Sequence, residues 1–334
     1  MTMRVGDIEL YKTFLCTIDP ALPVPNYNEV KLDAEDALYG YTAKLCAAAL
    51  SDTAARTASY GGDDYLASVA PVEPEGLEAM VSILSDAMYA LVRDNATMRA
   101  GCAIFTFFLA EERPHVAMFK LPFQEMFQCR LSAEGDVSWL LNSKVMPKPT
   151  LKGCEYFTAD VVNGVVRVAD VEAYIDDVKV NYLAETVLRL RPKTSEKKTV
   201  EVMREAAVEV IRECYPKEQV PDKIMEYKSE VANHAESTGC VSVHAVEETV
   251  FSDSESAGER FHERMQVAQI PNEPITVSPK TERALTRKQK IVTDNGIEIL
   301  VPVSYLRNPD YVEYVQAEDG KITILIKDIN SIDL

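Results

Sequence analysis

The sequence predicts an α+β protein with an N-terminal antiparallel sheet and flanking helices, a helical middle region and a small C-terminal β-hairpin unit. Three observations predict this order: short β-rich runs in the first region, amphipathic helical repeats in the second, and two turn-separated apolar runs at the end. The expected regions are a mixed α+β domain at 1–175, the helical region at 176–270, and a connector with the hairpin unit at 271–334.

The first 100 residues predict one strand and two helices. Residues 3–18 can form a strand, after which three prolines break the chain. The Ala-rich segment 34–50 is typical of a helix. A second helix opens at Pro74, and its apolar stripe has helical spacing: Leu77, Met80, Val81, Leu84, Met88, Leu91 and Val92.

The chain changes character at Cys102, where short runs rich in β-branched and aromatic residues begin. These runs predict strands at 103–110, 115–121, 123–131, 137–141 and 155–169. Asn163-Gly164 supplies a hairpin turn inside the last run, because these residue types tolerate a positive φ. We expect an antiparallel sheet with helices on one side.

The middle of the chain predicts several helices. One is expected near 178–190, followed by a longer helix that Ser195 can cap. The longer helix has one apolar face: Val200, Met203, Ala207, Val210, Ile211 and Cys214. Three polar segments are also expected to be helical: 221–234, 243–251 and 254–266. An extended connector should follow, because it contains Pro271, Pro274 and Pro279.

Two tight hairpins are expected near the C-terminal end. Asp294-Asn295-Gly296 supplies the turn of the first hairpin and is followed by apolar residues with a period of two. Asp319-Gly320 turns the second, and Asn308-Pro309-Asp310 links the two hairpins as a turn.

The hairpin region also carries a resemblance to a known family. A cationic run leads into TDNGIEILVP, and the chain closes with DGKITILI; upstream, residues 174–203 read YIDDVKVNYLAETVLRLRPKTSEKKTVEVM. These segments resemble the C-terminal and middle parts of the bacterial nucleoid-associated protein family of the YejK/NdpA type. The resemblance covers roughly residues 150–330. It implies a non-enzymatic protein that binds DNA with little sequence preference.

The overall charge opposes that implication, but the local charge is uneven. The chain has 35 basic and 53 acidic residues, a net charge of −18, whereas proteins that hold DNA normally present basic surfaces. Only charges within about 8 to 10 Å interact strongly at physiological salt. Two clusters are rich in basic residues: Arg189, Arg191, Lys193, Lys197, Lys198 and Arg204 in the first, and Lys280, Arg283, Arg287, Lys288 and Lys290 in the second.

Each basic cluster has a plainer interpretation. A helix with mixed Lys and Glu, as at 194–214, is usually a solvated face with pairs at i,i+4, and the cluster at 280–290 is typical of a charged linker. The resemblance instead implies that both clusters contact DNA. The residues it implies are Arg189, Arg191, Lys193, Lys197 and Lys198 of the first cluster and all five residues of the second.

The sequence contains none of the common catalytic motifs for nucleotide hydrolysis, hydride transfer, acyl transfer or zinc proteolysis. Asp63 and Asp64 could hold Mg²⁺ but lack a third ligand, and a Gly-Gly-Asp-Asp segment is also an ordinary surface turn. His234, Cys240 and His244 are zinc-ligand types without a fourth partner. We therefore expect no catalytic residues, no metal and no cofactor.

The cysteines and the hydropathy suggest a location. Seven scattered cysteines without a CxxC pair argue for free thiols in a reducing cytoplasm. The first residues lack an apolar signal region, and no apolar run reaches the roughly 20 residues of a membrane helix. These features predict a cytoplasmic protein without membrane contact, and the resemblance adds the nucleoid.

The leading hypothesis is a nucleoid-associated protein that contacts double-stranded DNA through phosphates, acting as a homodimer that places two weak basic patches on one duplex. An alternative is an acidic module that docks on nucleoid or other DNA-handling proteins without touching DNA. A third interpretation is a metal-dependent nuclease that uses Asp63 and Asp64.

Overall fold

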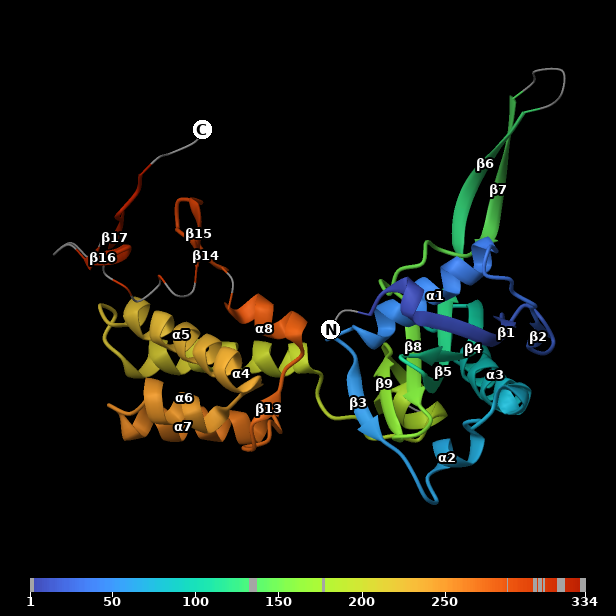
Figure 1. Cartoon of the computed structure of the whole chain (residues 1–334), viewed down its shortest axis with the longest axis horizontal. Helices are drawn as coiled ribbons and strands as arrows, with labels where there is room; N and C mark the ends of the chain where they lie inside the picture. Colours follow the sequence, from blue (N-terminus) through green and yellow to red (C-terminus); the bar gives the residue numbers. More distant parts are fainter. Residues whose placement is uncertain are drawn as a thin grey trace. The chain divides into compact units, whose positions relative to one another are not determined.

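The protein is an α+β protein, as predicted, with two compact units (Figure 1). The computed structural model describes residues 3–131, 137–175, 178–286, 288–302, 305, 308, 310–316 and 322–330. We call residues 3–193 the sheet unit and residues 194–334 the helical unit. The sequence placed a boundary after residue 175, whereas the sheet unit extends to Lys193 because Tyr182, Leu183 and Leu188 are buried in its core.

A seven-stranded antiparallel sheet forms the centre of the sheet unit. Its strands lie in the order β2-β1-β4-β5-β8-β9-β3. The predicted Asn163-Gly164 turn joins β8 to β9, and Gly164 has φ +60°. The strand bounds are Ile8–Ile18 (β1), Asn26–Glu29 (β2), Arg56–Ser59 (β3), Gly101–Ala110 (β4), Arg113–Pro122 (β5), Glu155–Asp160 (β8) and Val165–Ala169 (β9).

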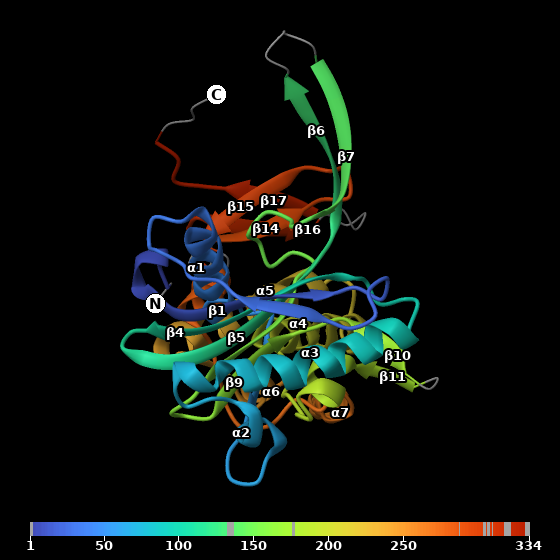
Figure 2. The same ribbon diagram turned by 90° about the vertical axis from the view of Figure 1, so that its right-hand side faces the viewer.

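Helices cover both faces of this sheet, so the expectation of helices on one side was wrong. Helix α3 (Leu77–Asp94) packs on the face that contains Phe105, and α1 (Ala37–Leu50) packs on the face that contains Phe108. Figure 2 shows the strands between these two helices. The nearly unbroken apolar sequence of β4 is the physical reason, because a strand buried on both faces does not alternate with polar residues.

Two further hairpins complete the sheet unit. Strands β6 (Gln124–Leu131) and β7 (Val137–Val145) were predicted as strands, but they form a separate two-stranded ribbon that extends from the sheet (Figure 1). Strands β10 (Glu172–Ile175) and β11 (Val178–Asn181) form the second. The helix predicted near 178–190 is only partly present: residues 178–181 form β11, and a π-helical turn follows at Tyr182–Val187.

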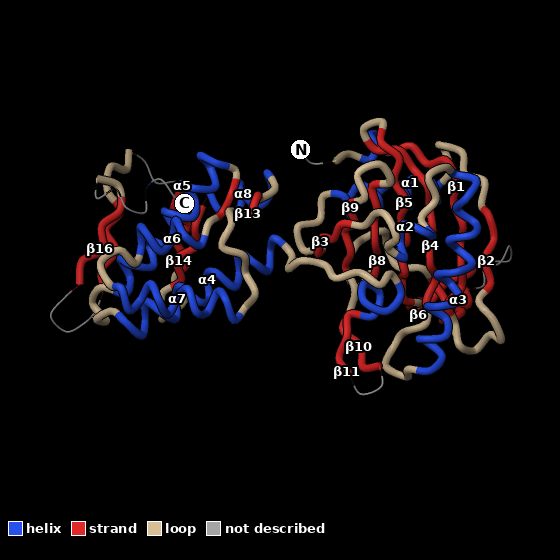
Figure 3. Tube along the Cα trace, turned by 90° about the horizontal axis from the view of Figure 1, so that it is seen from below, coloured by secondary structure: helices blue, strands red, loops and turns tan. Residues whose placement is uncertain are grey.

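The helical unit contains five helices among its described residues (Figure 3). The predicted Ser195 cap is confirmed: the Lys198 amide donates to Ser195 Oγ at 3.2 Å. The predicted apolar face of α4 lines the core of the unit, together with Phe251 and Phe261. The helix bounds are Glu196–Cys214 (α4), Val220–Thr238 (α5), Val243–Val250 (α6), Glu255–Val267 (α7) and Pro279–Thr286 (α8).

The expected extended connector is only partly extended. Ile275–Thr276 (β13) pairs with Cys240–Val241 (β12), but Pro279 begins helix α8. Proline suits the first position of a helix because the amide it lacks would have no partner inside the helix. Proline spacing alone does not distinguish a connector from a helix start.

Both predicted C-terminal hairpins are present. Strands β14 (Lys288–Val292) and β15 (Glu298–Pro302) form the first, and Gly296 in its turn has φ +86°. Strands β16 (Val312–Gln316) and β17 (Ile322–Ile326) form the second. The predicted turn residues Asp319 and Gly320, and Pro309 in the predicted link, lie outside the described residues.

Candidate nucleic-acid interface

The predicted basic residues Lys197 and Lys198 lie in the first turn of α4. Both side chains are exposed. The amide groups at the start of a helix give this end a partial positive charge, so both side chains project from an electropositive end. Lys198 Nζ lies 3.4 Å from the carboxylate of Glu201, an exposed pair that contributes little to stability.

Lys280 and Arg283 lie on α8, and both are exposed. Ser278 starts this helix: its Oγ accepts from the Thr281 amide at 3.3 Å, and its carbonyl accepts from the Glu282 amide at 2.9 Å. Residues three apart share one side of a helix, so Lys280 and Arg283 extend from the same side of α8.

A carboxylate joins the starts of the two helices. Oε1 of Glu196 accepts hydrogen bonds from the backbone amide of Ser278 at 2.8 Å and from its hydroxyl at 3.0 Å. We call this junction, with Lys197, Lys198, Lys280 and Arg283, the α4–α8 corner. It brings together residues from the two basic clusters that are about eighty positions apart in the sequence.

The α4–α8 corner has a small positive excess. Its four basic side chains stand against three nearby carboxylates, those of Glu196, Glu201 and Glu282. Within the described part of the chain, Lys197, Lys280 and Arg283 form no ion pair. These three charges are therefore free to meet an external anion.

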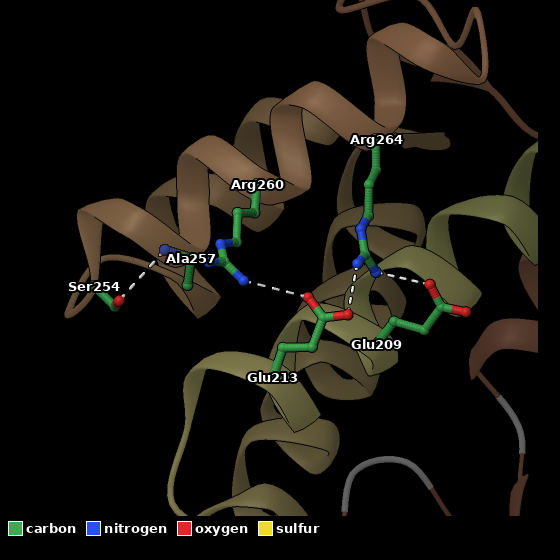
Figure 4. Close-up of polar contacts among 6 residues, drawn as sticks. All are labelled: Glu209, Glu213, Ser254, Ala257, Arg260 and Arg264. Carbon is green, nitrogen blue, oxygen red and sulfur yellow. Dashed lines mark hydrogen bonds and ion pairs between the residues drawn. The ribbon is translucent and has the colours of Figure 1, made fainter.

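Two arginines of helix α7 are committed to partners inside the helical unit. Arg264 on α7 donates to Glu209 and to Glu213 on α4, both at 2.7 Å, and Arg260 reaches Glu213 at 3.5 Å (Figure 4). The Arg264 side chain holds the pKa of the Glu213 carboxyl below its usual value, chiefly through this hydrogen bond. This side of α4 is consequently neutralised, unlike its first turn.

Arg189, Arg191 and Lys193 belong to the sheet unit, so the first predicted cluster is divided between the two units. The Arg189 guanidinium lies 4.3 Å from the centre of the Tyr65 ring, and its backbone has φ +54°. The backbone amide of Lys193 donates to Thr57 at 2.7 Å. All three residues are exposed, and Arg189 also makes a local cation–π contact.

The rest of the second predicted cluster is described only in part. Arg287 lies outside the described residues. Lys288 and Lys290 lie in β14, where their backbones pair with Pro302 and Leu300.

The structure also contains a buried polar cluster that the sequence did not predict. Lys120 is only 1% exposed; its Nζ lies 2.9 Å from Glu155 Oε2 and 3.0 Å from the Tyr182 hydroxyl, which also donates to Glu155. Burial, and next the adjacent Glu155, raise the pKa of Tyr182 well above its usual value. These hydrogen bonds attach the π-helical turn to β5 and β8, so the cluster stabilises the fold of the sheet unit.

The same turn is held by a second buried carboxylate. Asp170 accepts from the Ala184 amide at 3.0 Å and from Arg56 at 2.6 Å, while burial raises its pKa. Tyr182 is the residue from which the buried polar cluster could have been predicted, because a buried tyrosine requires a polar partner for its hydroxyl.

The candidate metal residues take part in ordinary local contacts. The Asp64 carboxylate accepts from the Gly61 amide at 2.9 Å, and His244 lies 3.2 Å from Glu248 on its own helix. In the part of the chain that the structure describes, no three His, Cys, Asp or Glu side chains group as metal ligands. No helix among the described residues is long and apolar enough to cross a membrane.

Comparison with known proteins adds no identification. No protein-family model matches the chain, and no curated protein matches it.

Proposed function

We propose that this chain is a non-enzymatic, nucleoid-associated protein that binds double-stranded DNA with little sequence preference. One observation carries the proposal: the hydrogen bonds that Glu196 accepts from Ser278 bring lysines of both basic clusters to the α4–α8 corner. Lys197, Lys280 and Arg283 contact backbone phosphates there and release counterions from the duplex. Phosphate contacts position a protein on DNA without reading its sequence.

The acidic remainder of the chain limits this contact to a small area. The sheet unit has 18 basic and 27 acidic residues, and the helical unit has 17 and 26, so neither is basic as a whole. Affinity should therefore be weak for one copy and should fall steeply with salt, because counterion release drives the binding.

The test is fluorescence anisotropy with a labelled duplex of about 30 base pairs, titrated at several salt concentrations. Lys197→Gln/Lys280→Gln should weaken binding and reduce the salt slope by about 0.9 for each phosphate that is no longer neutralised. Arg212→Gln/Lys217→Gln is the matched control, since it removes two exposed positive charges from the other end of α4 and the loop after it. Equally weakened binding in both variants would show that the corner is not the contact.

The acidic charge of both units favours a second candidate, an interaction module that docks on the basic surfaces of DNA-handling proteins. The same titration separates the two functions. A protein that does not bind the duplex even at low salt would support the interaction module and would contradict direct DNA contact.

A further inference from the structure

The two C-terminal hairpins pack against helix α5 through a small apolar cluster. Its buried members among the described residues are Met225 and Ala232 of α5, Val301 of β15 and Val312 of β16. Figure 1 shows both hairpins on the side of α5 away from α6 and α7. The core that holds α4 to α7 together is separate and contains many more buried side chains. The hairpins are therefore attached to the helical unit by far fewer apolar contacts than the helices are to one another.

The contact between α5 and the hairpins also contains two buried hydroxyls without a hydrogen-bond partner among the described residues. Ser229 lies four positions after Met225 and three before Ala232, so it shares their side of α5. Its Oγ and the hydroxyl of Tyr314, which packs on this cluster from β16, are both unpartnered. Burial, and next the nearby Asp222, raise the pKa of Tyr314. A buried hydroxyl without a partner weakens a contact by about 5- to 150-fold.

Buried hydroxyls between the helices are treated differently. The Tyr215 hydroxyl donates to Asp253 at 2.6 Å, and the Ser242 hydroxyl accepts from the Ala245 amide at 3.2 Å. These groups keep their hydrogen bonds in the folded protein, so they do not weaken the contacts around them. The contact of the hairpins with α5 is consequently the less complementary of the two.

Each hairpin is a two-stranded sheet with its own internal polar contacts. In the first, the Ile297 amide donates to Thr293 Oγ1 at 2.9 Å, and in the second Lys327 pairs with Glu313. These contacts stabilise the turn and the strands but do not attach them to α5. A two-stranded hairpin is marginally stable alone, so the hairpins should be well ordered only while they are docked.

We propose that the two hairpins form a cover on α5 that opens while helices α4 to α8 stay folded. Opening exposes Met225 and Ala232, but water then satisfies the hydroxyls of Ser229 and Tyr314, which offsets part of the cost. Helix α8 stays in place because Leu285 packs with the core of the helical unit. The open form presents an apolar stripe of α5 and leaves the α4–α8 corner unchanged.

The experiment is hydrogen–deuterium exchange of the full chain without DNA, followed by mass spectrometry of peptides from β14 to β17, α4 and α7. The hairpin amides should exchange at least about tenfold faster than the amides of α4 and α7, because the cover opens without unfolding of the helices. They should still exchange more slowly than amides in an unfolded chain, because the docked form predominates.

Two double variants separate the role of the buried hydroxyls from a general effect of substitution. Ser229→Ala/Tyr314→Phe removes both unpartnered groups and should slow exchange of the hairpin amides by about tenfold or more. Ser237→Ala/Tyr305→Phe removes exposed hydroxyls from α5 and from the segment between the hairpins, and should leave the exchange as in the wild type. A third variant, Val312→Ala, should speed hairpin exchange by about tenfold and leave α4 and α7 unaffected.

Three results would overturn the proposal. Hairpin amides that exchange only as fast as those of α4 would mean that no separate opening occurs, and hairpin amides without any protection would mean that no docked cover exists. Unchanged or faster exchange in Ser229→Ala/Tyr314→Phe would mean that the two hydroxyls are already satisfied, by water or by Asp222. None of these results depends on DNA binding, because Lys280 and Arg283 lie on α8 and not on the hairpins.

Discussion

The sheet unit contains a fully buried ion pair beside exposed ones, whereas the ion pairs described in the helical unit are all at least partly exposed. In the sheet unit, Lys120 and Glu155 are buried and pair with each other beneath the π-helical turn. In the helical unit, charged pairs such as Arg264 with Glu213 lie at the surface, and three cations of the α4–α8 corner have no ion pair among the described residues. Buried charges must be paired because leaving water is costly, whereas exposed charges remain available for a ligand.

The largest expected effect comes from breaking the buried pair. Glu155→Ala leaves the Lys120 ammonium buried without its carboxylate, so the free energy of unfolding should fall by about 3 to 5 kcal/mol. Chemical denaturation would measure the change. Glu172→Ala, which removes the exposed partner of Lys179, is the control and should cost less than about 1 kcal/mol. Similar decreases in both variants would contradict the distinction between the two kinds of pair.

An intermediate effect is expected at Asp19, which is buried while its partner Lys144 is exposed. Asp19 also accepts from the Ala21 amide at 3.0 Å, and Asp19→Asn should reduce the free energy of unfolding by about 1 to 2 kcal/mol at neutral pH. The hydrogen bond from Lys144 is the main cause that lowers the Asp19 pKa below its usual value.

The pH dependence follows from that direction. A carboxyl whose pKa is lowered by folding stabilises the protein above its unfolded pKa, near 3.9, and loses this contribution as the pH falls through the folded value. The difference between wild type and Asp19→Asn should therefore shrink in acid below about pH 4. A difference that stays constant down to pH 2 would contradict the assigned role of the carboxylate.

The smallest effect is expected at the surface pairs between α4 and α7. Arg264→Ala should cost about 1 kcal/mol or less, because its pairs with Glu209 and Glu213 are partly exposed, and high salt should reduce the difference. Anisotropy should show unchanged DNA binding, since this arginine faces carboxylates. A decrease in affinity comparable to that of Lys197→Gln/Lys280→Gln would move the proposed contact away from the α4–α8 corner.

Much of the fold could be predicted because its signals are local. The Asn163-Gly164 and Asp294-Asn295-Gly296 turns, the Ser195 cap and the stripe that starts at Leu77 each act within one turn or one helix, and all are present. The helix expected near 178–190 is shortened to the π-helical turn Tyr182–Val187, because residues 178–181 pair with β10 instead. Local preference was weaker there than strand pairing.

The candidate site could be predicted only in part. Composition alone identified Lys197, Lys198, Lys280 and Arg283 as members of basic clusters, but not which of them meet. These residues come together because Glu196 accepts hydrogen bonds from Ser278. The two residues are 82 positions apart and form no recognisable sequence motif. The separate β6–β7 ribbon could not be predicted either, because an alternating strand has the same pattern whether or not its apolar side joins a larger sheet.

The sequence by itself determined the fold class, the turns, the helix starts and the excess of acid, because each depends on neighbouring residues or on composition. Only the tertiary structure decided that β4 is covered on both faces, that Lys120 pairs with Glu155, and that the ribbon stands apart from the sheet. These features require contacts between segments tens of residues apart. Such contacts are set by packing and by the need to pair buried polar groups, and neither has a short-range signature in the chain.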